Sequence, residues 1–370
     1  MAEPTTSLLH ALLAGGGTGG HIFPALAVAE ELEKRGCRVS FTGSETGLEA
    51  RLVTERGIPF HPLPARPLVG RGLAGKVQAL TTLASSGRAA SRMIRDLKVD
   101  VVLGTGGYVS APAVVGARLA GRPILLLEPN ARAGVANRWL SRWASAAAIG
   151  YAETAHDLKC PAWVTGVPVR SRFFEVPAQL PPLSMTDSPR LLVLGGSQGA
   201  RQINDAMPDA ARRLVERLPS VRILHQAGAR NLDDARAAYE KAGLGSPHVE
   251  IVPFLDDVAS EMGRSHLLVS RAGAITLAEI CAAGRPSVLL PLAIAQGHQV
   301  DNARVLADAG AAELLLSEEV DGGKLAERLL DLLTSPLERL SAMGRAARSL
   351  ARPNAVIEIA DRLELLGDAR

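Results

Sequence analysis

Cysteine is scarce in this sequence: only Cys37, Cys160 and Cys281 occur in 370 residues. They are far apart, odd in number and without the spacing of metal ligands, so we expect neither a disulfide framework nor a zinc site. Free thiols of this kind are typical of a reducing cytosol. The N-terminus also lacks the basic segment that begins a signal peptide, and none is predicted.

Long hydrophobic runs are missing as well. The longest apolar region, 101–120, contains Pro112, Arg118 and four glycines. A membrane-spanning helix needs about 20 consecutive, mostly apolar residues, so this region is not expected to cross a bilayer. We therefore expect a protein that is cytosolic or lies on a membrane surface.

Neither sign of charge is in large excess, because 41 basic side chains are balanced by 38 acidic ones, a net charge of +3. This balance gives no indication of a nucleic-acid partner. The two halves differ, however: residues 1–166 carry a net charge of +6 and residues 167–370 a net charge of −3. The first half is therefore expected to meet something anionic.

Glycine, in contrast, is abundant where short apolar runs end. A helical pattern follows the first run, ends at Gly36, and is followed by a second run. Strand, glycine loop, helix and strand in this order predict a parallel sheet covered by helices. The runs expected as strands are Leu8–Ala14, Val39–Thr42, Val99–Leu103, Leu191–Leu194 and Leu267–Ser270.

The pattern also repeats at long range, because the glycine loops that begin at Gly15 and Gly195 lie 180 residues apart. Together with the length and a hydrophobic content of 47%, this repeat predicts two similar doubly wound α/β domains in tandem. We place the first domain at residues 1–166 and the second at 167–353.

Prolines mark two further boundaries. The segment 175–190 contains four prolines and is expected to be the linker between the domains. Pro353 interrupts a helical stretch, so a final helix at about Asn354–Leu366 could leave the second domain and pack elsewhere, as part of 354–370.

Ligands of parallel sheets bind at the carboxyl ends of the strands, where four glycine loops of this sequence are expected. Backbone N–H groups at the start of a helix can hold a phosphate without a lysine. The alternative is that these glycines only make tight turns between a strand and a helix. None of the loops has the GxxxxGK[ST] pattern, so a P-loop nucleotide triphosphatase is excluded.

The first loop contains the pattern GxGxxG at Gly15, Gly17 and Gly20. In a dinucleotide-binding protein an acidic residue would close the next strand, and Glu45 could take that role. The residue that follows the loop is His21, whose imidazole could act as a general base in a cleft. The alternative is that His21 only caps the start of the helix.

The loops and the segments between them resemble, in the same order, the motifs of the MurG family. These enzymes are the UDP-N-acetylglucosamine transferases that convert lipid I to lipid II in bacterial peptidoglycan synthesis. The ordered set covers nearly the whole chain and is far more specific than any single motif. The matching segments are GGTGGHIFP at 16–24, GGYVSAP at 106–112, EPN at 128–130, NRWL at 137–140, GVPVR at 166–170, GGSQGA at 195–200, FLDD at 254–257, SRAGA at 270–274 with Glu279, HQ at 298–299 and NA at 302–303.

The resemblance implies an α/β protein with the GT-B glycosyltransferase fold: two Rossmann-like, doubly wound domains with an interdomain cleft, and a C-terminal helix that returns to the first domain. It implies inverting transfer of N-acetylglucosamine from UDP-GlcNAc to the C4 hydroxyl of the muramoyl sugar of undecaprenyl-diphosphate-linked MurNAc-pentapeptide. The implied location is peripheral, on the cytoplasmic face of the cell inner membrane. An anionic membrane surface and other cell-wall synthesis proteins are the further partners that it implies.

The resemblance assigns the nucleotide and sugar of the donor to the second domain. Leu255 would meet the uracil through its backbone, Glu279 would accept hydrogen bonds from the ribose hydroxyls, and Ser197 with the amides of 274–276 would hold the diphosphate. Gln299 and Asn302, three residues apart on one helical face, would bind the sugar. The full set implied for UDP-GlcNAc is Thr18, Gly19, Gly20, Asn130, Arg170, Ser197, Leu255, Ala274, Ile275, Thr276, Leu277, Ala278, Glu279, Gln299 and Asn302.

Several of these residues could have a purely structural role, or none, instead of binding the donor. Thr276 and Glu279 have the spacing of a capping box at a helix start. Gln299 and Asn302 could lie on a solvated helix face, and Arg170 could be a solvated surface residue.

The acceptor diphosphate is implied to lie on the loops at Thr18–His21 and 104–107. The residues assigned to it in the second loop are Gly104, Gly106, Gly107 and Tyr108. His21 is the first candidate for the catalytic base, and its alternative is to bind phosphate as an imidazolium. Glu128 is the second candidate, and it could instead orient the acceptor together with Asn130.

Charge stabilisation on the departing UDP is expected from helix N-termini and Arg271. The sequence has no D-x-D motif for a divalent cation, and the resemblance implies no cofactor. We therefore expect activity without a bound metal.

The region 59–98 is strongly basic, since Asp96 is its only acidic residue. Leucines and valines are interleaved with the basic residues, which predicts an amphipathic surface suited to anionic lipid headgroups. The alternative is an ordinary pair of helices with a solvated basic face. The basic residues are Arg66, Arg71, Lys76, Arg88, Arg92, Arg95 and Lys98.

Three competing functions remain open at this point. A related transferase with a diacylglycerol-type lipid acceptor would share the donor half and differ in the first domain. A nicotinamide or flavin oxidoreductase rests only on the GxGxxG pattern. A non-catalytic partner that binds a nucleotide sugar is disfavoured, because donor and acceptor motifs occur together on one chain.

Overall fold

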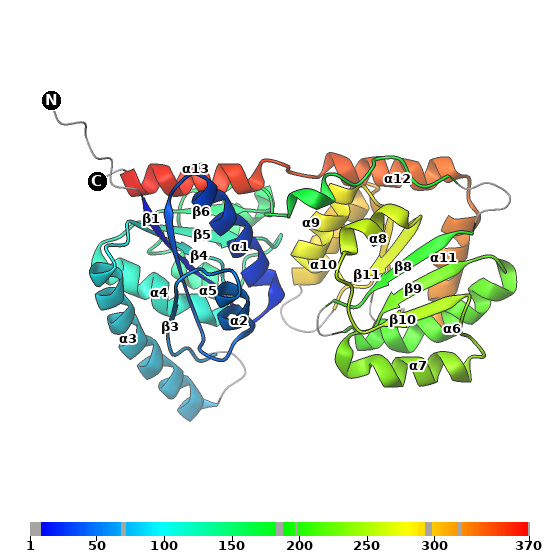
Figure 1. The fold of residues 1–370 in the computed structure, drawn as a ribbon, viewed down its shortest axis with the longest axis horizontal. Helices are drawn as coiled ribbons and strands as arrows, with labels where there is room; N and C mark the ends of the chain where they lie inside the picture. Colours follow the sequence, from blue (N-terminus) through cyan, green and yellow to red (C-terminus); the bar gives the residue numbers. More distant parts are fainter. Residues whose placement is uncertain are drawn as a thin grey trace. The chain divides into compact units, whose positions relative to one another are not determined.

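The computed structural model describes residues 9–67, 72–182, 188–196, 199–292, 298–316 and 320–368. The chain divides into two compact units. Unit 1 comprises Met1–Val169 and Asn354–Arg370, and unit 2 comprises Arg170–Pro353. Each unit is built on one parallel β-sheet with helices packed against it (Figure 1).

Unit 1 contains a seven-stranded parallel sheet in the order β3-β2-β1-β4-β5-β6-β7. Its strands are β1 (His10–Ala14), β2 (Arg38–Gly43), β3 (Phe60–Pro62), β4 (Val101–Gly104), β5 (Ile124–Glu128), β6 (Ala146–Ile149) and β7 (Ala162–Val164). Its helices are α1 (Gly19–Lys34), α2 (Leu48–Thr54), α3 (Leu73–Asp96), α4 (Gly107–Ala120), α5 (Val135–Leu140), the 3-10 helix η1 (Ala152–Asp157) and α13 (Ala355–Asp368).

The central strand β1 is buried on both faces of this sheet. Leu13 packs in one hydrophobic cluster with Ile359 of α13, whereas Leu12 packs in a second cluster with Ile94 of α3. Helices therefore cover both faces of the sheet. A strand of this kind needs apolar side chains at successive positions, which explains the apolar sequence HALLA of β1.

Unit 2 contains a six-stranded parallel sheet in the order β10-β9-β8-β11-β12-β13. Its strands are β8 (Arg190–Leu194), β9 (Arg222–Gln226), β10 (Val249–Val252), β11 (Leu267–Ser270), β12 (Ser287–Leu289) and β13 (Ala312–Leu314). Its helices are η2 (Ser171–Phe173), α6 (Arg201–Arg217), η3 (Ala229–Asn231), α7 (Leu232–Lys241), α8 (Val258–Arg264), α9 (Ala274–Ala283), α10 (His298–Asp308), α11 (Gly322–Thr334) and α12 (Leu337–Ser349).

The first six strands of unit 1 and the six strands of unit 2 have the same order, 3-2-1-4-5-6. In such a doubly wound sheet the order of the strands reverses between the first and the fourth strand, and ligands bind beside the carboxyl ends of these strands. The loops after β1 and β4 lie at this point in unit 1, and those after β8 and β11 lie there in unit 2.

The proline-rich segment 175–190 is not the linker that the sequence predicted. The units meet in the chain at Val169 and Arg170, before this segment begins. Its described part packs on unit 2, where Val176 is 7% exposed and Arg285 Nη2 donates to the carbonyl oxygen of Pro177 at 2.9 Å. The described part of this segment therefore belongs to unit 2, where the side chains of Val176 and Leu180 are buried.

Unit 1 also differs from the prediction near residue 99. Strand β4 begins at Val101 rather than at Val99, because Val99 still bonds back to the last turn of α3. Lys98 has a positive φ of 54°, and the N–H of Val99 bonds back to the carbonyl of Ile94, which closes the helix. Helix α3 itself is one continuous helix of 24 residues, not a pair.

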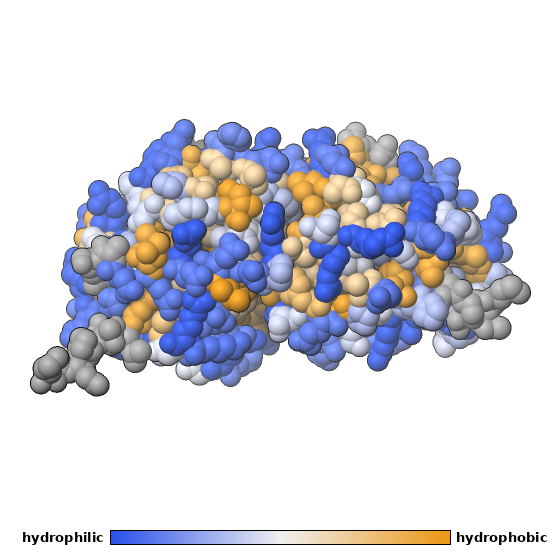
Figure 2. All heavy atoms as spheres, turned by 90° about the horizontal axis from the view of Figure 1, so that it is seen from above, coloured by the Kyte–Doolittle hydropathy of each residue, from blue (hydrophilic) through white to orange (hydrophobic). Residues whose placement is uncertain are grey.

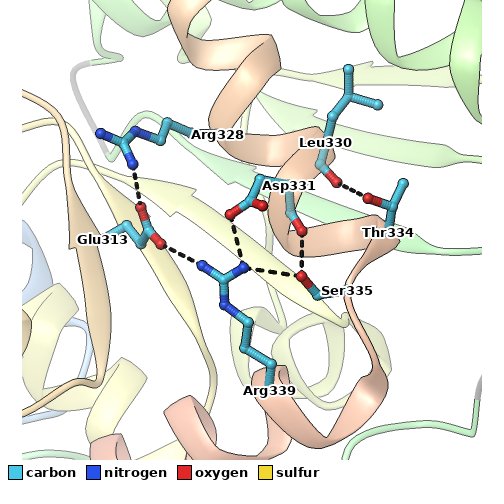
Figure 3. A network of polar contacts seen from close by, with 7 residues as sticks. All are labelled: Glu313, Arg328, Leu330, Asp331, Thr334, Ser335 and Arg339. Atoms are coloured by element: carbon cyan, nitrogen blue, oxygen red, sulfur yellow. Dashed lines mark hydrogen bonds and ion pairs between the residues drawn. The ribbon is translucent and has the colours of Figure 1, made fainter.

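A polar network holds α11 and α12 beside the edge strand β13 (Figure 3). Arg339 binds Glu313 at 3.1 Å and Asp331 at 2.8 Å, and Arg328 binds the second oxygen of Glu313 at 3.3 Å. These side chains are partly exposed, so the network orients the helices and adds little to the free energy of unfolding.

Among the helices in the described part of the chain, none is long and apolar enough to span a membrane. On the face seen in Figure 2, hydrophobic side chains lie in small groups between hydrophilic ones.

Candidate active site

The first glycine loop leads from β1 into α1 and places His21 in the first helical turn. Thr18 is the N-cap residue, with extended backbone angles, so His21 is not the cap of this helix and that alternative is wrong. His21 Nδ1 lies 2.8 Å from the carbonyl oxygen of Thr105. Since a carbonyl only accepts, Nδ1 carries the proton, and Nε2 keeps a free lone pair in the neutral ring.

Burial lowers the pKa of His21, although the nearby charge of Glu128 and the bond to Thr105 oppose this shift. The neutral imidazole is therefore the form present near pH 7. A neutral ring with a lone pair on Nε2 can accept a proton from a hydroxyl group.

The second glycine loop, after β4, packs directly against the His21 ring. Gly106 and Gly107 both have positive φ angles, 90° and 71°. A Cβ atom on Gly106 would lie 3.2 Å from His21 Cε1, and one on Gly107 would lie 3.2 Å from His21 Cδ2. Only glycine allows this backbone so close to the imidazole, so the two loops meet around His21.

The remaining residues of the second loop differ in exposure. Tyr108, in the first turn of α4, is 41% exposed. Gly104, in contrast, is the last residue of β4 and is buried, and a Cβ atom there would lie 2.9 Å from Val114. Gly107 and Tyr108 are thus the more exposed part of this loop, whereas Gly104 and Gly106 are buried.

Glu128, at the end of β5, is 2% exposed and accepts four hydrogen bonds. Its Oε1 accepts from the backbone N–H and the side-chain amide of Asn130, at 3.1 and 2.8 Å. Its Oε2 accepts from the Gly134 N–H at 2.8 Å and from Asn137 Nδ2 at 3.0 Å. Through these bonds the carboxylate orients the amide side chains of Asn130 and Asn137.

The acidic residue that contacts the first loop is Glu49, which the sequence analysis did not identify. Glu49 is fully buried and accepts from the Gly17 N–H at 3.1 Å. Glu45, the candidate for a dinucleotide ribose, is exposed. The Glu49 carboxylate, which is bonded to this loop N–H, would repel a pyrophosphate at the same position. The structure therefore offers no support for the dinucleotide alternative.

In unit 2, α9 begins at Ala274 with Gly273 as its N-cap. Thr276 is therefore inside the first turn and Glu279 in the second, so the capping-box alternative is wrong. Ala274, Ile275 and Thr276 carry amides of the first turn, which make no bonds within a helix. Leu277 is fully buried and Ala278 half-buried beside them.

Glu279 and Arg170 come together in unit 2. Glu279 Oε1 lies 3.5 Å from Arg170 Nη2, and the Glu279 side chain is only 17% exposed. Burial raises the pKa of Glu279 to about 7, and the charge of Arg170 opposes this rise. Arg170 also lies over the Phe173 ring, at 5.2 Å from its centroid, so it is not simply a solvated residue.

Gln299 and Asn302 both lie on α10, as expected, but they do not form a solvated face. Asn302 is fully buried and donates to the carbonyl oxygen of Ala272 at 3.2 Å. Gln299 accepts from the Leu292 N–H at 3.0 Å. The two amides tie α10 to the loops that follow β11 and β12.

The third glycine loop is held by Gln226, at the end of β9, which the sequence analysis also missed. Gln226 Oε1 accepts from the Gly196 N–H at 3.0 Å, and its Nε2 donates to the Gly196 carbonyl at 2.9 Å and to that of Pro253 at 3.3 Å. This amide joins the loop to the segment that leads to the half-buried Leu255. Ser197 lies outside the described residues, as do residues 293–297 before α10.

Arg271 follows β11 in the same unit. Its Nη1 donates to Gln202 Oε1 at 2.9 Å and to the Leu290 carbonyl oxygen at 3.1 Å. Burial lowers the pKa of this guanidinium, but it remains a cation near pH 7. These bonds fix a positive charge at the carboxyl end of the sheet.

Two Rossmann-like parallel sheets, each with glycine loops at its ligand-binding edge, are the architecture of the GT-B fold. Residues 11–149 match the glycosyltransferase family 28 N-terminal domain, and residues 190–360 match the glycosyltransferase family 28 C-terminal domain. The chain therefore belongs to glycosyltransferase family 28. The α/β fold and the transferase class expected from the sequence are confirmed.

Curated relatives match over nearly the whole chain. A UDP-N-acetylglucosamine–N-acetylmuramyl-(pentapeptide) pyrophosphoryl-undecaprenol N-acetylglucosamine transferase of Halorhodospira halophila is 42% identical over 350 residues, covering 94% of this chain and 96% of the relative. A relative with the same name from Syntrophotalea carbinolica is 42% identical over 343 residues, covering 92% and 94%.

Solved structures agree with this match. The crystal structure of Acinetobacter baumannii MurG superposes with a TM-score of 0.78 at 33% identity, covering 96% of this chain and 99% of that one. A putative UDP-N-acetylglucosamine 2-epimerase from Listeria monocytogenes has a TM-score of 0.71 at 16% identity, covering 98% and 97%, and shares the fold alone.

Proposed function

We propose that this transferase moves N-acetylglucosamine from UDP-GlcNAc to the C4 hydroxyl of the muramoyl sugar of undecaprenyl-diphosphate-linked MurNAc-pentapeptide, a step of peptidoglycan synthesis. The observation that carries this proposal is the 42% identity, over 94% of the chain, to a transferase named for this reaction. A diacylglycerol-type acceptor is not favoured, because the match covers the acceptor half as fully as the donor half.

Unit 2, which corresponds to the expected second domain, binds the donor in this proposal. The backbone at Leu255 meets the uracil, and Glu279 accepts from the ribose hydroxyls, with Arg170 as its partner. The amides of 274–276 and the third glycine loop with Ser197 hold the diphosphate. Gln299 binds the sugar hydroxyls, whereas the fully buried Asn302 holds α10 to the loop after β11.

Unit 1 binds the acceptor. Its diphosphate lies on the amides of Thr18, Gly19 and Gly20 at the start of α1, and on the second loop, from Gly106 to Tyr108. Asn130, whose amide nitrogen donates to Glu128, contacts the sugars in this proposal.

His21 is the catalytic base in this mechanism. Its Nε2 lone pair accepts the proton of the C4 hydroxyl while that oxygen attacks the anomeric carbon from the face opposite UDP. The bond from the anomeric carbon to the diphosphate breaks, and the first turn of α9 and Arg271 stabilise the charge on the leaving UDP. Glu128 is a positioning residue, since its four hydrogen bonds satisfy the carboxylate.

The proposed location is peripheral, on the cytoplasmic face of the cell inner membrane, where other cell-wall synthesis proteins are partners. Helix α3 supplies the contact with anionic lipid. Val77 and Leu80 on this helix are 60% and 51% exposed, and Arg88, Arg92 and Arg95 are exposed on it as well. Exposed apolar side chains next to cations suit a lipid surface.

The test is UDP release from UDP-GlcNAc in EDTA, with and without a soluble lipid I analogue. We expect release that depends on the analogue, together with a disaccharide product. Donor binding without release would retain the donor site and overturn the acceptor. Loss of activity in EDTA that Mg²⁺ restores would overturn metal independence.

A further inference from the structure

The carboxylate of Glu49 is built into the underside of the first glycine loop. Glu49 stands at the start of α2 and has no exposed surface. Its Oε2 accepts from the Gly17 N–H at 3.1 Å, and its Oε1 accepts from the N–H and the hydroxyl of Ser44, at 2.9 and 2.5 Å. The carboxylate therefore joins the loop after β1 to the loop after β2.

Three glycines enclose this carboxylate so closely that a side chain at any of these positions would displace it. A Cβ atom on Gly16 or Gly47 would lie 2.2 or 2.3 Å from Glu49 Cδ, and one on Gly43 would lie 2.5 Å from its Cγ. A buried carboxylate is costly unless donors surround it. Here burial raises the pKa of Glu49, but the Ser44 hydroxyl and the backbone donors outweigh it and lower the pKa below its usual range.

The same position in unit 2 has a different chemistry. Gly17 and Gly196 both have positive φ angles, 81° and 75°, in the loops after the first strands of their sheets. In each loop a side chain that follows or ends the second strand takes the glycine N–H: Glu49 in unit 1 and Gln226 in unit 2. The amide is neutral and the carboxylate is charged, so the two loops are held alike but differ in charge.

We infer that Glu49 is a positioning residue, which fixes the first glycine loop and thereby sets Thr18 and His21 for the acceptor. The bond to Gly17 holds the loop directly before the N-cap of α1, and His21 follows within one turn. Because Glu49 takes the Gly17 N–H and brings a negative charge there, the acceptor diphosphate is directed to the first turn of α1. The inference rests on the proposed function.

The test is Glu49→Gln, which keeps the shape of the side chain. The single amide oxygen faces the two donors of Ser44, so the NH₂ group faces the Gly17 N–H and the loop loses its bond. We expect kcat/KM for a soluble lipid I analogue to fall about tenfold or more, while KM for UDP-GlcNAc changes by less than about twofold. Ser44→Ala, which removes one donor to the carboxylate, is expected to change the same constant by about twofold to fivefold.

Two controls separate positioning from general instability. Gln226→Leu loosens the matching loop of unit 2 and is expected to raise KM for UDP-GlcNAc, with KM for the acceptor within about twofold. Arg35→Met removes ion pairs elsewhere in unit 1 and is expected to lower Tm without a change in either KM.

The inference is overturned if Glu49→Gln and Ser44→Ala leave the acceptor constants unchanged, or if they raise both KM values equally while the wild-type protein is active. Absence of transfer by the wild-type protein would instead overturn the proposed function, and this inference with it.

Discussion

The imidazole of His21 is bonded to a carbonyl oxygen rather than to a carboxylate. This partner fixes the tautomer and leaves the pKa below the ordinary value, since burial is not offset by a bound anion. His21→Ala is therefore expected to reduce kcat about 10²- to 10⁴-fold with little change in KM for the acceptor. The wild-type kcat/KM for the acceptor, measured at saturating UDP-GlcNAc, should rise with pH below about 6.5 and stay level near neutrality.

These effects are checked by steady-state kinetics between pH 5 and 8, with the exposed His156→Ala as the control variant. A His21→Ala protein that keeps its kcat and shows a raised acceptor KM would assign phosphate binding to the imidazole instead.

Glu279 provides a second prediction at the scale of one residue, because burial raises its pKa to about 7. The ionised fraction then grows as pH rises through 7, and a carboxylate is the better acceptor for two ribose hydroxyls. UDP binding is expected to tighten between pH 6 and 8 and to weaken about tenfold, without this pH dependence, in Glu279→Gln. Titration calorimetry measures the UDP affinity of the wild type and of Glu279→Gln across this pH range, with Glu250→Gln on β10 as the control. An unchanged UDP affinity in Glu279→Gln would contradict the ribose role.

The raised pKa of Glu279 also makes the free energy of unfolding depend on pH, in a direction that can be worked out. The folded state binds the proton more tightly than the unfolded chain, whose carboxyl has the ordinary value. Between about pH 4.5 and 7 the unfolded state is the more ionised one, so the contribution of Glu279 to the free energy of unfolding falls as pH rises.

Some single residues could be predicted from sequence and others could not. The spacing of Gln299 and Asn302 placed them on one helix, and His21 stands directly after a glycine loop. Glu49 and Gln226 belong to no motif, and their importance comes from packing between segments far apart in the chain. The GxGxxG pattern indicates Glu45 as the acid after β2, four residues before Glu49, which is the buried one.

At the scale of elements, the buried strands were the predictable part. Strand β11 runs from Leu267 to Ser270, as expected, because a parallel strand covered on both faces leaves an uninterrupted apolar run. The edge strands β3 and β7 have three residues each and are partly exposed, so they leave no such run. Helix α3 gave a clear basic pattern, but the sequence did not decide between one helix and two.

Helix α3 leads to a prediction on membrane binding. Changing Arg88, Arg92 and Arg95 together to Gln removes three exposed cations from the face that carries Val77 and Leu80. Each cation near an anionic surface contributes about 1 kcal/mol, so vesicle affinity should fall about 10²-fold at low salt. Sedimentation with phosphatidylglycerol vesicles measures this change.

The matched control for α3 removes three exposed cations from unit 2 instead, by changing Arg230, Arg236 and Lys241 to Gln. It is expected to leave vesicle binding within about twofold of the wild type. Equal losses in the two variants would mean that net charge, and not the α3 face, determines binding.

For the whole molecule, the repeat of strand, glycine loop and helix was enough to predict two doubly wound units. The unit on which the last helix packs could not be predicted from hydrophobic periodicity, because an apolar helix face fits any sheet. In the structure α13 belongs to unit 1 although it follows unit 2 in sequence, so the chain passes between the units twice. Ion pairs between α13 and Arg35, at the end of α1, distinguish unit 1 as the partner of this helix.

The ion pairs of Arg35 with α13 allow this attachment to be tested. Arg35, at the end of α1, binds Asp361 and Glu364 of α13, each at 2.7 Å, and its side chain is only 21% exposed. Arg35→Met should lower the free energy of unfolding by about 1–2 kcal/mol and Tm by about 2–6 °C. Arg51→Met, which breaks an exposed pair within α2, should change Tm by less than about 1 °C. Calorimetry of the two variants compares these losses, and equal values would show that the pairs with α13 add nothing to the stability of unit 1.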